Sequence, residues 1–286
     1  MRDYHGLAGL VLCLVLLAVI TPAAVKKNIE VTLQEKQVRD LTSSGLLLNF
    51  YVRIANTSAS RYLLTKYDTR AVIERTEYLR LETALEQSIS IEPKGETLIA
   101  LPLKITYALL FQAVAGLENV PQVACQMTGL MTFIDEKKRQ EKIPFAFAAE
   151  FPVFKDPEVI FSPVRLKDLT MGGADLVLGV TFRNGNAFDL TAERILYLIE
   201  LGGQKVAEGT IRELNPWTAG GEKHYSFPLL LDFFEMGGQL FPLLQVTAVE
   251  GRISGQIEAD TVWGRVKIPI EKTVQVPVSR SGGTDL

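Results

Sequence analysis

Histidine and cysteine, on which most hydrolytic and metal sites depend, are scarce in this chain of 286 residues, which has two of each. His5 and Cys13 lie in or beside an apolar N-terminal run. The body of the chain therefore has one histidine, His224, and one cysteine, Cys125. A histidine-based metal cluster or a Ser-His-Asp triad in each half is impossible with this set.

The local sequences of these two residues do not favour chemistry either. His224 lies in GGEKHYSF with no cysteine or carboxylate at ligand spacing, which indicates a surface residue at the start of a strand rather than a catalytic base. Cys125 has apolar neighbours, which predicts a buried, unreactive thiol. The glycine pairs do not open a phosphate loop. We expect no catalytic residue, no metal site and no cofactor.

A repeated sequence is the strongest feature of the chain. Residues 37–59 are QVRDLTSSGLLLNFYVRIANTSA, and residues 165–187 are RLKDLTMGGADLVLGVTFRNGNA. Asp40 matches Asp168 and Asn56 matches Asn184, each pair separated by 128 positions. The repeat predicts a duplicated domain, and the chain length suits about two domains.

Alternating apolar residues predict a strand over residues 48–54 and another over 176–182. Both strands end at a polar break, Asn56-Thr57-Ser58 or Asn184-Gly185-Asn186, because Asn and Gly favour turns. Further β-type runs lie at 88–91, 97–103, 130–134, 195–201, 206–211 and 262–268. Apolar residues at helical spacing predict one helix in each half, over 107–117 and 233–244.

These elements predict a mainly β fold of two tandem β-sandwiches, each with one amphipathic crossover helix. The first domain is expected over residues 28–154 and the second over 156–279, joined at FKDPE, with a flexible tail at 280–286.

Residues 1–27 are a separate segment. Residues 7–20, LAGLVLCLVLLAVI, follow Arg2 and precede small residues, which is the layout of a secretory signal. The run is short for a membrane span, yet an uncleaved anchor stays open if the small residues through Val25 are counted. We expect an exported protein, either periplasmic or anchored to the membrane, with cleavage undecided.

The bulk composition excludes few classes. Apolar residues make up 47% and the formal net charge is −3, without a basic run beside aromatic residues, so nucleic acid is not an expected partner. With one cysteine in the body, that part of the chain has no internal disulfide.

The six repeated polar positions are the candidate site residues, and we interpret them as structural: Asp40, Asn56, Ser58, Asp168, Asn184 and Asn186. Asp40 and Asp168 fit corners that accept backbone N–H groups. The alternative is a repeated contact with an ion or a partner. Asn56-Thr57-Ser58 also fits the glycosylation sequon, which matters only in a eukaryotic secretory route.

The basic-Asp-Leu element, the alternating strand and the following Asn-x-(Asn or Ser) resemble the late embryogenesis abundant type 2 family, whose unit is the WHy (water stress and hypersensitive response) domain. The resemblance covers residues 29–278. Thr57 and Gly185 replace the usual proline in the two halves, and the first half is the weaker match because Ser58 also replaces the second asparagine. It implies sandwiches similar to fibronectin type III or immunoglobulin domains. It also implies a role in desiccation, cold or other water stress, without catalytic residues.

Three hypotheses remain open. The first is a non-catalytic stress-protection protein of the cell envelope that binds or shields stressed client proteins or membrane surfaces. The second is an envelope binding module for a protein, glycan or lipid. The third is an enzyme. A polar cleft with convergent carboxylates in one half would favour the enzyme, whereas an apolar trough across both halves would favour lipid or client binding.

Overall fold

The computed structural model describes residues 28–212, 215–232 and 246–280. Within these ranges the chain is mainly β, with several sheets and one short α-helix, which confirms the predicted fold class at this level. The predicted segment 1–27 and the predicted helix over 233–244 lie outside the described residues, as does the tail after Arg280. None of the described helices is long and apolar enough to cross a membrane.

The strands of the first half form two antiparallel sheets, ordered β1-β2-β5 and β4-β3-β6-β7. The two sheets contact each other through the stacked rings of Phe50 and Phe147. Their bounds are β1 (Ile29–Thr42), β2 (Gly45–Asn56), β3 (Tyr62–Ile73), β4 (Thr76–Ile91), β5 (Glu96–Thr106), β6 (Gln122–Asp135) and β7 (Gln140–Pro152).

The second half has the strand path β12-β11-β15-β16-β9-β10-β14, with β13 on β11 and β8 on β10. A parallel pair between β16 and β9 joins two antiparallel parts into one sheet. The bounds are β8 (Glu158–Phe161), β9 (Val164–Leu169), β10 (Gly173–Arg183), β11 (Leu190–Leu201), β12 (Gln204–Ile211), β13 (Pro216–Trp217), β14 (Glu222–Asp232), β15 (Ala248–Thr261) and β16 (Gly264–Arg280).

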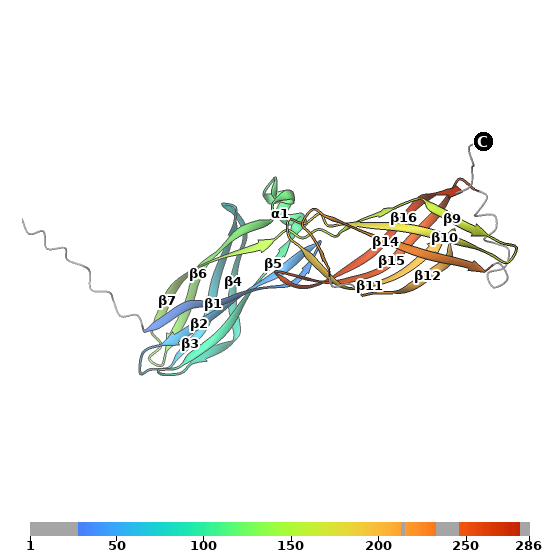
Figure 1. Ribbon diagram of the computed structural model, residues 1–286. Helices are drawn as coiled ribbons and strands as arrows, with labels where there is room; N and C mark the ends of the chain where they lie inside the picture. Colours follow the sequence, from blue (N-terminus) through green and yellow to red (C-terminus); the bar gives the residue numbers. More distant parts are fainter. Residues whose placement is uncertain (1–27, 213–214, 233–245, 281–286) are drawn as a thin grey trace, which may run out of the picture.

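The two halves have the same strand order. The order β1-β2-β5 in the first half corresponds to β9-β10-β14 in the second, and β4-β3-β6-β7 corresponds to β12-β11-β15-β16. The difference is at β1 and β7, which lie in contact without pairing, whereas β9 and β16 are hydrogen-bonded. Figure 1 shows the two groups of strands end to end, with β1 of the first half reaching toward the second.

The core follows the alternation of the sequence. On β2 the side chains of Leu48, Phe50, Val52 and Ile54 are at most 1% exposed, and on β10 the equivalent Leu176, Leu178, Val180 and Phe182 are at most 3% exposed. Each of these strands is paired on both sides, and its inward side chains are covered by the rest of the core.

The helix of the first half is shorter than predicted. Helix α1 (Tyr107–Ala113) ends before Leu117, which belongs to a separate 3₁₀ turn (Leu117–Asn119). Val114 is already extended and Gly116 has a left-handed φ of 85°. The glycine therefore turns the chain after the two turns of α1, and Leu117 beyond it belongs to the separate 3₁₀ turn.

Candidate functional site

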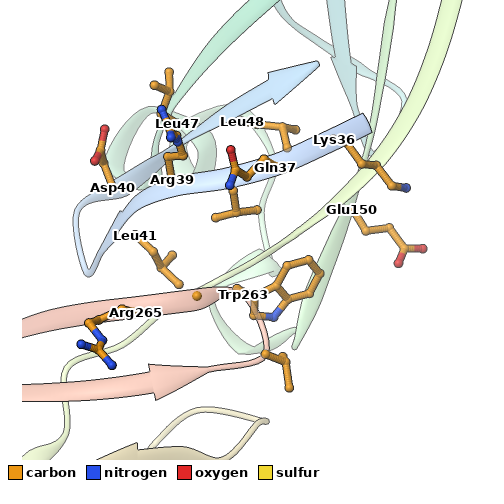
Figure 2. Close-up of a pocket in the computed structure, with 13 residues that line it drawn as sticks. Lys36, Gln37, Arg39, Asp40, Leu41, Leu47, Leu48, Glu150, Trp263 and Arg265 are labelled. Atoms are coloured by element: carbon orange, nitrogen blue, oxygen red, sulfur yellow. The ribbon is translucent and has the colours of Figure 1, made fainter. Parts of the chain in front are cut away.

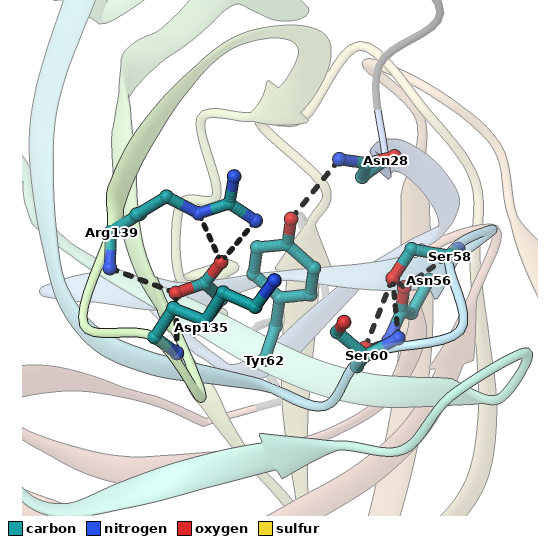
Figure 3. Close-up of polar contacts among 8 residues, drawn as sticks. Asn28, Asn56, Ser58, Ser60, Tyr62, Asp135 and Arg139 are labelled. Carbon is teal, nitrogen blue, oxygen red and sulfur yellow. Dashed lines mark hydrogen bonds and ion pairs between the residues drawn. The ribbon is translucent and has the colours of Figure 1, made fainter.

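Asn56 lies at the end of β2 and holds the turn that follows it (Figure 3). Its amide nitrogen lies 2.7 Å from the carbonyl oxygen of Ser60, 3.2 Å from that of Ile91 and 3.0 Å from that of Glu92. Its side-chain oxygen accepts from the backbone N–H of Ser58 at 3.0 Å and from the Ser58 hydroxyl at 2.8 Å. Both ends of this side chain are therefore used inside the fold.

Asn184 repeats this arrangement in the second half. Its amide nitrogen lies 2.9 Å from the carbonyl oxygen of Phe188, 3.0 Å from that of Trp217 and 3.2 Å from that of Thr218. Its oxygen accepts from the backbone N–H and the side-chain amide of Asn186, each at 3.0 Å. Asn56 is 2% exposed and Asn184 is fully buried, so these amides stabilise the turns. Asn56 is also inaccessible for glycosylation in the folded chain.

Asn186 has an additional contact that its counterpart Ser58 lacks. Its side-chain oxygen accepts from the backbone N–H of Lys155 at 2.7 Å, and its amide donates to the Lys155 carbonyl at 2.8 Å. Lys155 belongs to the segment between β7 and β8, so Asn186 ties this connection to the second half.

The two repeated aspartates lie beside β-bulges of the first hairpin in each half. Asp168 accepts the backbone N–H of Leu169 at 2.9 Å, as expected for a corner residue. Asp40 has a positive φ of 50°, a conformation that Asp tolerates better than most residues. Its carboxylate accepts no hydrogen bond within the described residues, so the expected N–H contact is absent at this copy.

The connection between the halves is also held from the first half. The hydroxyl of Tyr107, at the start of α1, donates to the carbonyl of Pro152 at 2.8 Å and accepts from the backbone N–H of Phe154 at 3.2 Å. Burial raises the pKa of Tyr107 to about 12, so it stays a neutral donor. The ring of Phe154, 2% exposed, stacks on Phe188 of the second half. The two halves therefore share a fixed junction.

A hollow of about 730 Å³ lies at this junction and takes its walls from both halves. Residues from β1, the start of β2, β7 and the hairpin between β15 and β16 line it, and they include Lys36, Leu41, Glu150, Val262, Trp263 and Arg265. Figure 2 shows Leu41 pointing from β1 toward the hairpin, whereas Asp40 points away from it. The predicted position Asp40 borders this pocket, while the five other candidate residues are not among those that line it.

Some charged side chains of the pocket form ion pairs and others do not. Arg265 is held by Asp260 at 2.9 Å and Glu193 at 2.8 Å, and its guanidinium lowers the pKa of Asp260. Lys36 and Glu150 extend at the same end of the pocket (Figure 2) and form no ion pair with the residues that the structure describes. The Lys36 ammonium and the Glu150 carboxylate therefore have no ion-pair partner among the described residues, and they lie at one end of a pocket that Leu41 and Trp263 also line.

Sequence reasoning missed Trp263, because its strand lies far from β1 in the chain. A signal is present in the turn that carries it. The hydroxyl of Thr261 bonds the carbonyl of Gly264 at 2.8 Å, as Thr42 bonds Gly45 at 3.1 Å and Thr170 bonds Gly173 at 3.2 Å. Trp263 lies inside such a Thr-x-x-Gly hairpin turn and packs half-buried against the core, so a tryptophan in this turn is a signal for a contact with another element.

The reactive residue types lie away from this pocket. His224 is exposed on β14, with Nδ1 3.0 Å from the hydroxyl of Thr181. Cys125 is 1% exposed, and burial raises the pKa of its thiol to about 12. No group of three or more His, Cys, Asp or Glu side chains within metal-binding distance occurs among the residues described.

The family model described as late embryogenesis abundant protein matches residues 180–274. No curated protein matches the chain. Among solved structures, an Archaeoglobus fulgidus protein is 12% identical with a TM-score of 0.32 and covers 44% of this chain and 95% of its own. A solution structure from Arabidopsis thaliana is 15% identical with a TM-score of 0.35 and covers 47% and 89%.

Red sea bream transglutaminase covers 88% of this chain and 31% of its own, at 13% identity and a TM-score of 0.28. At these scores the structural alignments do not establish a shared fold. The family match supports a relationship between the second half of the chain and the late embryogenesis abundant type 2 family.

Proposed function

We propose that this protein is a non-catalytic water-stress protein of the cell envelope, which binds or shields partly unfolded proteins or membrane surfaces. The family match over residues 180–274 supports a water-stress role without catalysis. The observation that carries the binding part of the proposal is the pocket shared by both halves, where Leu41, Val262 and Trp263 present apolar surface.

The proposal includes the finer organisation of the chain. Each half is a sandwich similar to immunoglobulin or fibronectin type III domains, and the two are tandem WHy domains over residues 28–154 and 156–279. The common strand order and the equivalent bonding of Asn56 and Asn184 support this duplication. Residues 1–27 act as a signal peptide or anchor that brings the protein to the envelope, which the apolar run at 7–20 supports.

The protective mechanism follows from the surface at the junction. Val262 is 80% exposed and lies beside the half-buried Trp263 in a turn that borders the pocket. A client that loses water exposes apolar side chains, and their burial against such a surface is favourable by about 25 cal/mol per Å². Lys36 and Glu150 at the rim weakly attract clients that carry negative or positive charge. Binding therefore need not depend on the sequence of the client.

The test uses the chain from Asn28 to Leu286, mixed with an aggregation-prone enzyme and taken through cycles of drying and freezing. An inert globular protein of equal mass is the control. We expect the enzyme to keep clearly more activity with this protein than with the control at a low molar ratio. Equal activity in both samples would reject the protective function.

A second candidate, an envelope binding module for a protein, glycan or lipid, is favoured by the free charges of Lys36 and Glu150 at one end of the pocket. In that case the protein retains one ligand from its native membrane and gives no general protection. Pull-down with the wild type and with the Lys36→Ala/Glu150→Ala variant distinguishes the two candidate functions. A ligand that binds specifically through these charges is retained by the wild type and lost from the variant.

A further inference from the structure

Strand β4 is an edge strand whose middle is uncovered. It pairs with β3 alone, and no other strand pairs with it in the parts of the chain that the structure describes. Its ends are tied down: the hydroxyl of Tyr78 accepts the backbone N–H of Thr106 at 3.0 Å, and the carbonyl of Ile91 accepts from Asn56 at 3.2 Å. The unpaired backbone groups of residues 79–84 form a template for another strand.

The other described edges are better protected. Strand β5 carries Pro102 and Lys104, residues that discourage pairing. Strand β7 lies in contact with β1, β12 carries Lys205, and β14 carries Lys223 and Pro228. Strand β4 has contacts with α1 and β2 in addition to its pairing with β3. Strand β4, TEYLRLETALEQSISI, has neither proline nor lysine. It is therefore the edge most open to addition of a strand.

A cross-strand row with Phe145 at its far end reaches this edge at Leu81. Leu81 is paired with Thr69, Thr69 with Gly129 and Gly129 with Phe145, so the row crosses all four strands of the sheet. These residues and their neighbours line a hollow of about 450 Å³, and Leu81 at its open end is 48% exposed. A second leucine placed beside Leu81 would extend the row and cover it.

The charged residues beside Leu81 in one copy of β4 are complementary to those in a second, antiparallel copy. Arg80 and Glu82 flank it, and their side chains are 65% and 73% exposed. Two copies of β4 in antiparallel register about Leu81 place Arg80 of each copy opposite Glu82 of the other. Opposite charges directly across a strand pair stabilise it. The present partners, Glu77 for Arg80 and Lys66 for Glu82, are surface ion pairs that can be shared or exchanged.

We propose that a second copy of this chain pairs with the first through β4, antiparallel and centred on Leu81. The two four-stranded sheets then form one continuous eight-stranded sheet, and each Leu81 covers the other. The free edge is removed in both copies.

Disulfide trapping tests the register in the full chain. The Leu81→Cys variant is made with Cys13→Ser, and Cys125 is kept because it is buried. Directly opposed residues of antiparallel strands have Cα atoms about 4.5–5.5 Å apart, which suits a disulfide. With molecular oxygen as oxidant, we expect a dimer on a non-reducing gel that reductant reverses. The matched variant Thr83→Cys faces Leu79 of the second copy and should stay monomeric.

A charge exchange tests the same contact without cysteine. Arg80→Glu should reduce trapping of the Leu81→Cys chain strongly, because two carboxylates then face each other across the strand pair, whereas Arg80→Glu with Glu82→Arg should restore it. Equal trapping at positions 81 and 83, no trapping at 81, or no rescue by the double exchange would overturn the proposal. Trapping at position 81 only with an unfolded client that carries one cysteine would also overturn it, and would assign the edge to client strands.

Discussion

At the residue scale, Asn56 and Asn184 show how one side chain fixes a repeated turn. Each amide faces three backbone carbonyls and accepts two hydrogen bonds from the residue two positions later. The sequence predicted these positions because the polar break recurs in register. It did not predict the carbonyl partners, which come from distant strands, and so it left a structural role and a ligand contact both open.

Asn184→Ala should destabilise the second half. The substitution leaves buried carbonyls, including that of Trp217, without a donor, and we expect a loss of about 2–3 kcal/mol in the free energy of unfolding. Both tryptophans, Trp217 and Trp263, lie in this half, so urea unfolding followed by their fluorescence reports it. Gln275→Ala, an exposed amide on β16, is the control and should cost less than about 0.5 kcal/mol. Equal effects of the two variants would contradict the role of Asn184.

Asp135 gives a pH-dependent prediction at the same scale (Figure 3). Burial opposes its ionisation, but the backbone N–H and guanidinium of Arg139 and the backbone N–H of Lys137 outweigh this and lower the pKa of its carboxyl. A lowered folded-state pKa contributes stability above the unfolded value of about 3.9, and this is lost as the pH falls through the folded-state pKa.

Asp135→Asn should therefore lower the Tm clearly at pH 7, and the difference from wild type should shrink below about pH 4. Thermal unfolding followed by circular dichroism between pH 2 and 7 measures it. The neighbouring exposed Glu136→Gln is the matched control. A difference that stays constant over this range would show that the carboxylate charge is not involved.

At the element scale, sequence periodicity worked where strands are regular and covered on one face, as in β2 and β10. It did not identify β3, because the bulge between Leu64 and Lys66 interrupts the alternation. It did not identify β7 either; this strand contains Pro144, which is tolerated because β7 lies at a sheet edge. The predicted helix was too long because Gly116 turns the chain, which helical spacing does not reveal.

Gly129→Ala tests the packing of the sheet β4-β3-β6-β7. A Cβ at this position would lie 1.9 Å from the carbonyl oxygen of Asp68 and 2.6 Å from the ring of Phe145, so the strands must separate. We expect a loss of about 1–3 kcal/mol in the free energy of unfolding. Gly185→Ala is the control, because its nearest neighbour, on Lys155, is 4.0 Å away. Chemical denaturation followed by circular dichroism measures both, and a tolerated Gly129→Ala would contradict the packing described.

At the scale of the whole molecule, the junction depends on residues that no local pattern brings together. Tyr107, Phe154 and Asn186 hold the connection, and the pocket combines β1 with a hairpin from the other end of the chain. The sequence predicted that the two halves join at FKDPE. The identity of the pocket residues depends on how the halves are oriented, which follows from these tertiary contacts.

Tyr107→Phe should loosen the junction without changing either core. The ring remains, but the bonds to Pro152 and Phe154 are lost. Small-angle X-ray scattering should show a broader distribution of interatomic distances, whereas Tyr67→Phe, in the same half but away from the junction, should leave the curve unchanged. Identical curves for Tyr107→Phe and wild type would mean that other contacts fix the orientation.

If clients bind at the pocket between the halves, the fluorescence of Trp263 should report their binding. A chemically unfolded, tryptophan-free client is titrated into the wild type and into Trp263→Phe, whose remaining Trp217 is 2% exposed and gives the background. We predict a saturable blue shift in the wild type that is absent in the variant, together with weaker protection by the variant during drying. If both proteins protect the client equally and the emission of Trp263 does not change, clients do not bind at this pocket.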